Sequence, residues 1–315
     1  MKQRPFGIAV AQLGPISRHE SRASAVARLL EMMREAASRG ADTVVFPELA
    51  LTTFFPRHWM TQEQAEEQYF EASMPGPETQ VLFDTARELH IGFYLGYAEL
   101  SADGKPYNTA ILVNKNAEIV GRYRKVHLPG HADHKPEAPF QHLEKKFFNV
   151  GNEGFFVWET MNAKIGMCLC NDRRWPETWR MFSLQSADIV MLGYNTPTVN
   201  IHWPEPAHLR MLHHLITLQA SAYQNAIWIA AAAKAGVEDG SHLIGGSVIV
   251  APTGEIVAQA QSEDDEVIFC QADLSLGDTF KQNVFNLAAH RRPEHYSLIV
   301  NQVGAGEPLG KPPQD

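Results

Sequence analysis

A cysteine at the end of an apolar segment is the part of the sequence that most strongly indicates chemistry. The alternation of side chains from Lys164 to Cys170 predicts a buried strand with Cys170 at its carboxyl end. Asn171 or Asp172 is placed to cap a helix predicted over residues 175–181, and a cysteine beside a helix amino terminus is favoured as a thiolate. Cys170 is therefore a candidate nucleophile, although a cysteine on an apolar strand is also a common core residue.

Two adjacent arginines, Arg173 and Arg174, follow this cysteine. A guanidinium binds a carboxylate through two parallel hydrogen bonds. An arginine beside a nucleophile therefore indicates a substrate that carries an acid near its reacting carbonyl. The alternative is a plain solvated pair of surface charges.

Two further charged residues stand at the ends of predicted strands. Residues 41–49 predict a short buried strand that stops at Pro47 and presents Glu48 just beyond it. Residues 118–125 predict the second strand of a hairpin, with Lys125 at its end. Taken singly, Glu48 is also compatible with a loop salt bridge and Lys125 with a solvated surface charge.

Together these residues resemble the Glu–Lys–Cys signature of the nitrilase superfamily. The segments that match in order and spacing are Phe46–Glu48, Arg124–His127 and Cys168–Asp172. The resemblance extends over nearly the whole chain. The segments that most resemble the N-carbamoyl-D-amino-acid hydrolases are Cys170–Trp179, Gly193–Pro197, and Phe285–Asn286 with His290–Arg291. This resemblance implies hydrolysis of N-carbamoyl-D-amino acids to D-amino acid, ammonia and carbon dioxide, without a cofactor.

The resemblance also implies a role for each signature residue. Cys170 is expected to attack the carbonyl, Glu48 to move the thiol proton to the departing ammonia, and Lys125 to stabilise the oxyanion. Glu144 matches a further active-site glutamate that positions Lys125 or the attacking water. The alternative for Glu144 is a surface ion pair.

Substrate binding is inferred from the same comparison. The carboxylate is expected at Arg174, and the residues expected to assist are Arg173, Asn171, Asn195, Thr196, His127 and His142. Anchoring both the carbonyl and the carboxylate leaves one direction for the side chain of each enantiomer, so we expect strong enantioselectivity. The choice of D over L comes only from the resemblance.

Several histidines in a loop could be taken for metal ligands. His127, His131 and His134 lie near Asp133, but the loop is rich in proline and glycine and lacks a helical histidine spacing. A thiol mechanism needs no metal, so we expect no metal site. Hydrogen bonds from His127 and His142 to the residues around Glu48 and Lys125 are the favoured interpretation.

The composition restricts the class of protein. With 315 residues, a net charge of −9 and 44% hydrophobic residues, the chain suits a soluble enzyme with a large core. It has neither a basic cluster for nucleic acid nor an apolar run near the roughly 20 residues of a membrane span. Three cysteines without framework spacing, and no signal-peptide core, favour the cytoplasm.

The elements that must position these residues alternate between strands and helices. Residues 20–39 predict a helix with Val26, Leu29, Leu30 and Met33 on one face, and 207–224 predict another. A further amphipathic helix face is predicted from Val81, Leu82, Ala86 and Leu89. Antiparallel strands are predicted over Val248–Val257 and Val267–Ala272. The resemblance implies how they stack, as an α/β, four-layer αββα sandwich. We expect one hydrolase domain over residues 1–303 and a flexible Gly/Pro-rich tail over residues 304–315.

Other functions remain open at this stage. A β-ureidopropionase or an ω-amidase would keep the signature residues but bind a carboxylate placed differently. A catalytically silent scaffold of the same fold would act through protein contacts. The resemblance also implies a homodimer or homotetramer, with Phe285–Tyr296 as a candidate interface.

Overall fold

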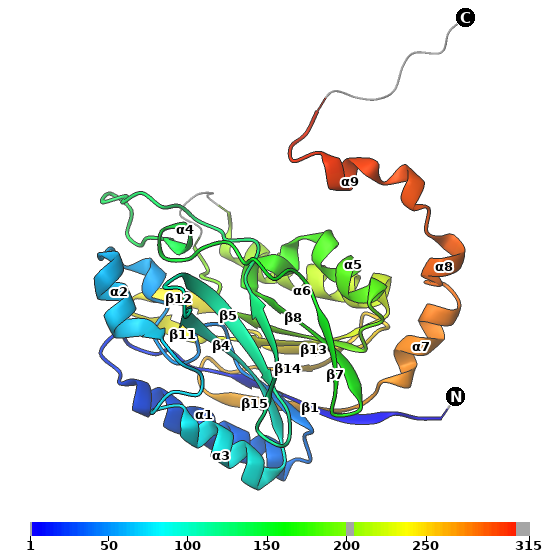
Figure 1. Ribbon diagram of the computed structural model, residues 1–315, viewed down its shortest axis with the longest axis horizontal. Helices are drawn as coiled ribbons and strands as arrows, with labels where there is room; N and C mark the ends of the chain where they lie inside the picture. Colours follow the sequence, from blue (N-terminus) through cyan, green and yellow to red (C-terminus); the bar gives the residue numbers. More distant parts are fainter. Residues whose placement is uncertain (1, 200–204, 307–315) are drawn as a thin grey trace, which may run out of the picture.

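Two stacked sheets with helices over both outer faces form the body of the protein (Figure 1). The computed structural model describes residues 2–199 and 205–306. This arrangement is the predicted αββα sandwich. The first sheet has the order β15-β1-β2-β4-β5-β6, with β3 beside β4, and its strands are β1 (Pro5–Gln12), β2 (Thr43–Val45), β3 (Phe70–Glu71), β4 (Gly92–Leu100), β5 (Pro106–Val113), β6 (Ile119–Arg124) and β15 (Glu266–Asp273).

The second sheet carries the strand that leads to Cys170. Its order is β14-β13-β10-β9-β8-β7, and its strands are β7 (Val157–Thr160), β8 (Ala163–Leu169), β9 (Ile189–Tyr194), β10 (Trp228–Ala233), β13 (Val248–Val250) and β14 (Ile256–Gln259). Strands β8, β9 and β10 are parallel, so their carboxyl ends meet at one edge. A separate hairpin consists of β11 (Ala235–Glu238) and β12 (Ser241–Ile244).

Helices α1 (Arg22–Ser38) and α3 (Gln80–Leu89) cover the first sheet (Figure 1). Helix α1 begins at Ser21, whose side chain accepts a hydrogen bond from the Ser24 amide, and its predicted apolar face is buried. The face predicted for α3 was wrong at Val81, which is 42% exposed. Val81 lies on the same helical face as the exposed Asp84 and Glu88, three and seven residues further on, and this face points away from the sheet.

Helices α5 (Pro176–Leu184) and α6 (Ala207–Asn225) cover the second sheet. The remaining helical segments are η1 (Phe55–Arg57), α2 (Gln62–Tyr69), α4 (Glu144–Phe147), η2 (Cys170–Arg174), α7 (Ser275–Gln282), α8 (Leu287–His290), η3 (Pro293–His295) and α9 (Ser297–Asn301). Across residues 2–199 and 205–306, no helix has the length and apolar character needed to cross a bilayer.

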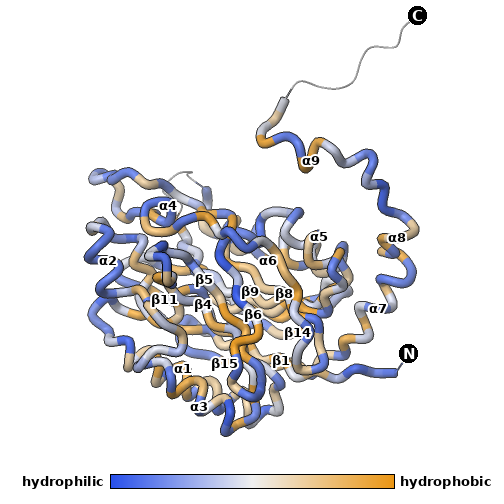
Figure 2. The backbone as a smooth tube through the Cα atoms, viewed as in Figure 1, coloured by the Kyte–Doolittle hydropathy of each residue, from blue (hydrophilic) through white to orange (hydrophobic). Residues whose placement is uncertain are grey.

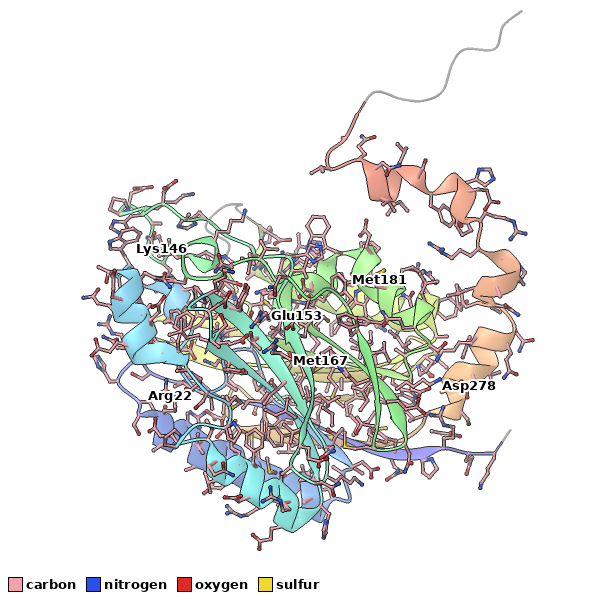
Figure 3. All side chains as sticks on the ribbon, in the orientation of Figure 1. Arg22, Lys146, Glu153, Met167, Met181 and Asp278 are labelled. Carbon is pink, nitrogen blue, oxygen red and sulfur yellow. The ribbon has the colours of Figure 1, made fainter. Side chains whose placement is uncertain are left out.

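The core between the sheets is apolar and includes a tyrosine hydroxyl of the first sheet that bonds to the second. Figure 2 shows hydrophobic residues along the central strands, and Figure 3 places Met167 in the interior. The Tyr94 hydroxyl on β4 donates to the Cys168 carbonyl at 2.9 Å and accepts from the Gly193 amide at 3.1 Å. These two bonds hold the carboxyl ends of β8 and β9 against the first sheet.

The chain after β15 leaves the body as an extended arm made of α7, α8, η3 and α9 (Figure 1). No residue of α8, η3 or α9 is buried. The predicted division into a domain and a tail stays a prediction, and residues 307–315 of that tail lie outside the described residues.

Candidate active site

Cys170 lies directly after β8, as predicted, and begins the short helix η2. Its φ angle is +44°, in the left-handed region that residues other than glycine rarely adopt. Backbone strain of this kind is common at functional sites, where surrounding contacts hold it in place. Cys170 is 6% exposed and lines a cavity of about 440 Å³. The sharp turn thus places a thiol at the wall of a cavity.

The expected helix cap is absent from this turn. Helix α5 begins after Trp175, which makes no side-chain cap. The Asp172 carboxylate instead accepts hydrogen bonds from the Leu169 amide at 3.1 Å, the Tyr123 hydroxyl at 2.7 Å and the His127 amide at 2.9 Å. Asp172 therefore fixes the turn around Cys170 rather than the start of the helix.

The thiolate predicted for Cys170 is also not supported. Burial raises the pKa of Cys170, and the nearby Glu48 carboxylate raises it further, against the lowering effect of Lys125. The resting side chain is therefore a protonated thiol. It needs a base before it can act as a nucleophile.

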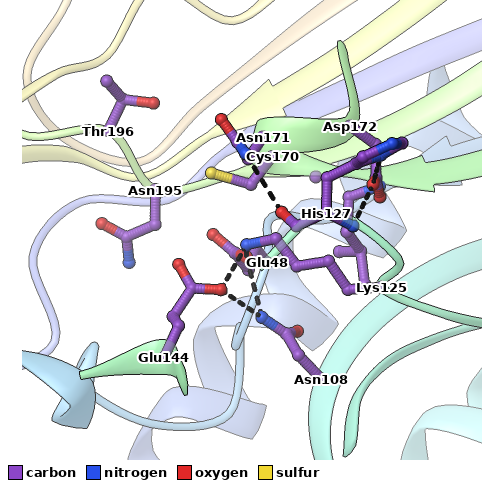
Figure 4. Close-up of polar contacts among 12 residues, drawn as sticks. Glu48, Asn108, Lys125, His127, Glu144, Cys170, Asn171, Asp172, Asn195 and Thr196 are labelled. Atoms are coloured by element: carbon purple, nitrogen blue, oxygen red, sulfur yellow. Dashed lines mark hydrogen bonds and ion pairs between the residues drawn. The ribbon is translucent and has the colours of Figure 1, made fainter. Parts of the chain in front are cut away.

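Glu48, Lys125 and Glu144 form a buried charge cluster beside Cys170 (Figure 4). The Lys125 Nζ is 2.7 Å from Glu48 Oε1 and 2.5 Å from Glu144 Oε2, and all three side chains are fully buried. Asn108 on β5 adds a hydrogen bond from Nδ2 to Glu48 Oε1 at 2.9 Å. The structure thus brings together the signature residues that the sequence predicted.

The two glutamates of this cluster differ in their affinity for a proton. Burial raises the pKa of Glu48, and the charge of Lys125 only partly offsets it. Burial acts the same way on Glu144, but there Lys125 and His142 outweigh it and the pKa is lowered. Burial lowers the pKa of Lys125, but its two carboxylate neighbours raise it more, so it stays charged. Of the two carboxyls, Glu48 is therefore the one better suited to accept and return a proton.

One oxygen of Glu48 is left for that exchange. Within the described part of the chain, Glu48 Oε2 is buried and has no hydrogen-bond partner. An unpartnered buried oxygen costs free energy because its desolvation is not offset by a hydrogen bond, and such atoms are retained where they have a function.

Positive charge dominates the cavity beside Cys170. Arg57, Arg174 and Arg210 line it, and the lining residues within the described ranges include no aspartate or glutamate. Arg57 pairs with Glu238 at 2.8 Å and Arg210 with Glu205 at 3.3 Å. Among residues 2–199 and 205–306, Arg174 has no ion-pair partner within 4.0 Å. Its guanidinium is therefore available to an anion.

Arg173 and Arg174 point to different surroundings although they are adjacent. Arg174 lines the cavity and stays exposed to solvent. Arg173 is 1% exposed, and its Nη1 donates to the Cys170 carbonyl at 2.6 Å while its Nη2 donates to Thr196 Oγ1 at 2.9 Å. The charge of Arg173 is the main cause that lowers the pKa of Arg174 to about 10. Arg174 remains protonated at neutral pH.

Most of the other predicted binding residues lie at the cavity. Asn171, Asn195, Thr196 and His142 line the cavity. Asn171 Nδ2 also donates to the His127 carbonyl at 3.1 Å.

The two histidines expected at the site have different surroundings. His142 Nε2 lies 3.3 Å from Glu144 Oε1, as expected for a histidine beside the charge cluster. His127 is not part of the cavity lining within the described ranges. Its Nδ1 contacts Asp172 Oδ1 at 2.8 Å, and its ring stacks on Trp175.

The histidines of the loop after Lys125 turn to different partners. His131 faces Gln141 at 3.3 Å, and His134 stacks on Trp59 with ring centroids 4.5 Å apart. No group of three or more His, Cys, Asp or Glu side chains suited to a metal was found within residues 2–199 and 205–306.

Sequence reasoning missed several polar residues that complete the site. Asn108 contacts Glu48, Arg57 contacts Asn195, and Glu238 contacts Arg57. Asn108 interrupts an apolar strand and Arg57 follows the apolar run 54–56, so each was detectable as a polar residue expected to be buried. Their partners were not detectable, because they come from distant parts of the chain.

Comparison with known proteins identifies the class of this protein. The family model for carbon-nitrogen hydrolases matches residues 7–282, and the chain belongs to that family, within the nitrilase superfamily.

Its curated relatives include a nitrilase of Pyrococcus abyssi, which is 30% identical over 270 residues that cover 84% of this chain and 90% of the relative. An N-carbamoylputrescine amidase of Arabidopsis thaliana is 30% identical over 291 residues, covering 89% and 91%. A citrullinase of Francisella tularensis is 26% identical over 303 residues, covering 94% and 98%.

Solved structures support the fold. A carbon-nitrogen hydrolase from Helicobacter pylori G27 superposes with a TM-score of 0.79 at 21% identity, covering 95% of this chain and 99% of the other. Nit3 of Saccharomyces cerevisiae gives a TM-score of 0.74 at 21% identity, covering 93% and 97%. The comparisons thus confirm the predicted superfamily and carbon-nitrogen hydrolase class.

Proposed function

We propose that the protein hydrolyses N-carbamoyl-D-amino acids to D-amino acid, ammonia and carbon dioxide. The observation that carries this proposal is the shared cavity of Cys170 and Arg174, a thiol and an unpaired guanidinium. A substrate with a carbamoyl group and a carboxylate on neighbouring atoms has one group for each.

The proposed reaction begins with a proton transfer from Cys170 to Glu48. The unpartnered Oε2 of Glu48 accepts the thiol proton as Sγ attacks the ureido carbon. The charged Lys125 stabilises the negative oxygen of the tetrahedral intermediate. Glu48 then returns the proton to the departing ammonia and leaves a carbamoyl group bonded to the sulfur.

Water completes the proposed cycle. Glu48 takes a proton from water, which attacks the carbamoyl-enzyme carbon and releases Cys170 with its proton restored. The released carbamic acid loses carbon dioxide and leaves the free amino acid. Glu144 stays ionised throughout and holds Lys125 in place.

The charge of the cavity supports an anionic substrate. A substrate with an ammonium at the far end from its carbamoyl group, such as N-carbamoylputrescine, would meet Arg174, which has no counter-ion within the described ranges, and no acidic lining residue among those described. At about 4 Å and an effective dielectric constant of about 20, repulsion between two positive charges costs about 4 kcal/mol before solvent screening. This argument favours a substrate carboxylate over an ammonium. Two of the relatives, the N-carbamoylputrescine amidase and the citrullinase, are named for other substrates.

The preference for the D enantiomer is supported by sequence alone. Residues 170–179 resemble the corresponding segment of the N-carbamoyl-D-amino-acid hydrolases. Two anchors, at Cys170 and Arg174, support the expectation of one preferred hand.

Ammonia release from a small panel of compounds tests the proposal. The panel contains N-carbamoyl-D-phenylalanine, its L enantiomer, N-carbamoyl-β-alanine, N-carbamoylputrescine and citrulline. The D compound should give the highest kcat/KM. Preference for N-carbamoylputrescine would overturn the carboxylate argument, and preference for the L compound would overturn the stereochemical one.

This panel, extended by two further measurements, separates the alternatives. Preference for N-carbamoyl-β-alanine would indicate a β-ureidopropionase, and glutamine analogues with a free terminal amide would reveal an ω-amidase. A silent scaffold would show no turnover and no preferential alkylation of Cys170 by iodoacetamide.

We also propose that the protein forms a homodimer or homotetramer through its arm. Val284, Leu298, Ile299 and Val300 of the arm are at least 48% exposed, which is unfavourable for apolar side chains in water. A second copy of the chain would cover them. Light scattering after gel filtration should give a multiple of 35.2 kDa, and deletion of residues 284–315 should reduce it to one chain.

A further inference from the structure

The amide of Asn195 is held in one orientation. Asn195 follows β9, is 3% exposed and lines the cavity. Its Oδ1 accepts a hydrogen bond of 2.6 Å from Arg57 Nη2. A guanidinium has donors only, so the oxygen of the amide must face Arg57 and the amide cannot flip.

The other end of this amide has no partner within the protein. Among residues 2–199 and 205–306, the buried Asn195 Nδ2 makes no hydrogen bond. A buried NH₂ group without an acceptor is costly, and the open side of Asn195 is the cavity that Cys170 lines (Figure 4). Asn195 Nδ2 is thus a hydrogen-bond donor that can bond to an acceptor on a bound substrate.

A buried carboxylate fixes Arg57 in turn. Arg57 is 4% exposed, and its Nη1 donates to Glu238 Oε1 at 2.8 Å. Glu238 is fully buried and also accepts from the backbone amides of Phe54 at 2.8 Å and Ile16 at 3.0 Å. Lys234 Nζ lies 3.1 Å from its second oxygen. With four donors around it, Glu238 stays ionised and holds Arg57 in one position.

These residues come from three separate parts of the fold. Arg57 belongs to η1 beyond the first sheet, Asn195 follows β9 of the second sheet, and Glu238 ends β11 of the separate hairpin. Hydrogen bonds that join three elements restrict the orientation of a side chain more than a contact within one element does. The arrangement is suited to setting the direction of one side chain at the cavity wall.

We propose that Arg57 and Glu238 are positioning residues that keep Asn195 as an obligatory hydrogen-bond donor, so that this wall selects a substrate with a carboxylate oxygen there. The inference rests on the proposed function, in which Asn195 assists Arg174 in binding the substrate carboxylate, and it adds the role of Arg57 and Glu238 in orienting that amide. It predicts that the network affects the choice of substrate rather than the chemical step at Cys170.

A pair of substrates that differ only in the carboxylate tests this role. N-carbamoyl-D-phenylalanine carries it, and N-carbamoyl-phenylethylamine has the same ring and ureido group without it. In Asn195→Asp the donor becomes an acceptor and a negative charge, so kcat/KM for the acid should fall roughly 100-fold or more. For the neutral compound it should change less than about threefold, since no hydrogen bond to a carboxylate is lost.

Arg57→Lys tests the positioning residue itself. Lysine keeps the charge but cannot hold both Glu238 and Asn195 with one planar fork, so the amide becomes free to rotate. KM for the acid should rise roughly 10-fold with kcat little changed, and the neutral compound should be unaffected. Arg28→Lys is the matched control, because Arg28, on the outer helix α1, forms a comparable pair of hydrogen bonds with Asp265.

Thermal unfolding of each variant separates a folding defect from a change in selectivity. If Arg57→Lys does not fold, Asn195→Asp, which removes no packing, still tests whether the donor at Asn195 selects the acid. Equal losses on both substrates, or no loss on the acid, would overturn the inference. A wild-type protein that does not favour the acid over the neutral compound would overturn the proposed function first, and the selectivity inferred here with it.

Discussion

Replacing Arg174 by methionine removes the charge that the proposed carboxylate contact requires. Arg174 has no ion-pair partner within the described ranges, so the substitution leaves no buried acid without a counter-ion. Methionine also keeps much of the side-chain volume at the cavity wall. The loss should therefore be confined to binding of the substrate carboxylate.

The size of this loss follows from the position of the guanidinium. An ion pair at about 4 Å with an effective dielectric constant of about 20 is worth about 4 kcal/mol. Arg174 is exposed on one side, so screening reduces this to about 2–3 kcal/mol. At about 1.4 kcal/mol for each factor of ten, kcat/KM should fall roughly 30- to 150-fold. Arg174→Lys keeps the charge but loses the fork, and roughly 10-fold is expected.

Ammonia release from N-carbamoyl-D-phenylalanine and from N-carbamoyl-phenylethylamine measures the effect. The neutral compound should react equally well with the wild type and with Arg174→Met. Arg173→Lys provides the contrast, because Arg173 bonds to the Cys170 carbonyl and its replacement should lower kcat for both compounds. If Arg174→Met slows both compounds to the same extent, the carboxylate is not bound by Arg174.

Three further predictions concern the nucleophile, the base and the buried network. Cys170→Ala should abolish turnover, whereas Cys168→Ala should retain substantial activity, since Cys168 is fully buried in the core; the reverse result would contradict the strand-end assignment. In Glu144→Gln the acidic limb of the kcat/KM profile should move to lower pH, because the charge of Glu144 raises the pKa of Glu48; an unchanged limb would argue against Glu48 as the base. Burial opposes ionisation of Glu238, but its cationic neighbours lower its pKa from 4.5 to about 2, so its stabilisation is complete above pH 4.5 and is lost as the pH falls through 2. Glu238→Gln should therefore cost about 3 kcal/mol in urea unfolding at pH 7 and much less near pH 2, and an equal cost at both pH values would refute this account.

The sequence was sufficient for the elements and for the residues that end strands. Period and apolar pattern predicted α1 and the strands around Cys170, because local side-chain alternation decides which face is buried. The signature residues follow strand ends, but Glu48 and Lys125 follow strands of the first sheet and Cys170 follows β8 of the second, so they meet only because the two sheets stack. The stacking of the sheets came only from the resemblance.

The sequence was not sufficient for the electrostatics of the site. A helix terminus suggested a thiolate at Cys170, but burial and Glu48 dominate there, and both depend on residues far away in the chain. The sequence likewise gave no sign that, of these two adjacent arginines, Arg173 is buried and Arg174 is open to the cavity. The network of Arg57 and Glu238 joins positions 181 residues apart, which no local pattern reveals.

The cation-rich wall of the cavity has a consequence for the release of product. In the proposed reaction the nitrogen next to the α-carbon is uncharged in the substrate and becomes an ammonium in the free amino acid. Arg57, Arg174 and Arg210 line the cavity, and its described lining residues offer this new charge no carboxylate. The product therefore gains a repulsion that the substrate lacked, while its carboxylate keeps the same contacts. Loss of carbon dioxide, which creates this ammonium, thus weakens binding at the site and favours release of the free amino acid.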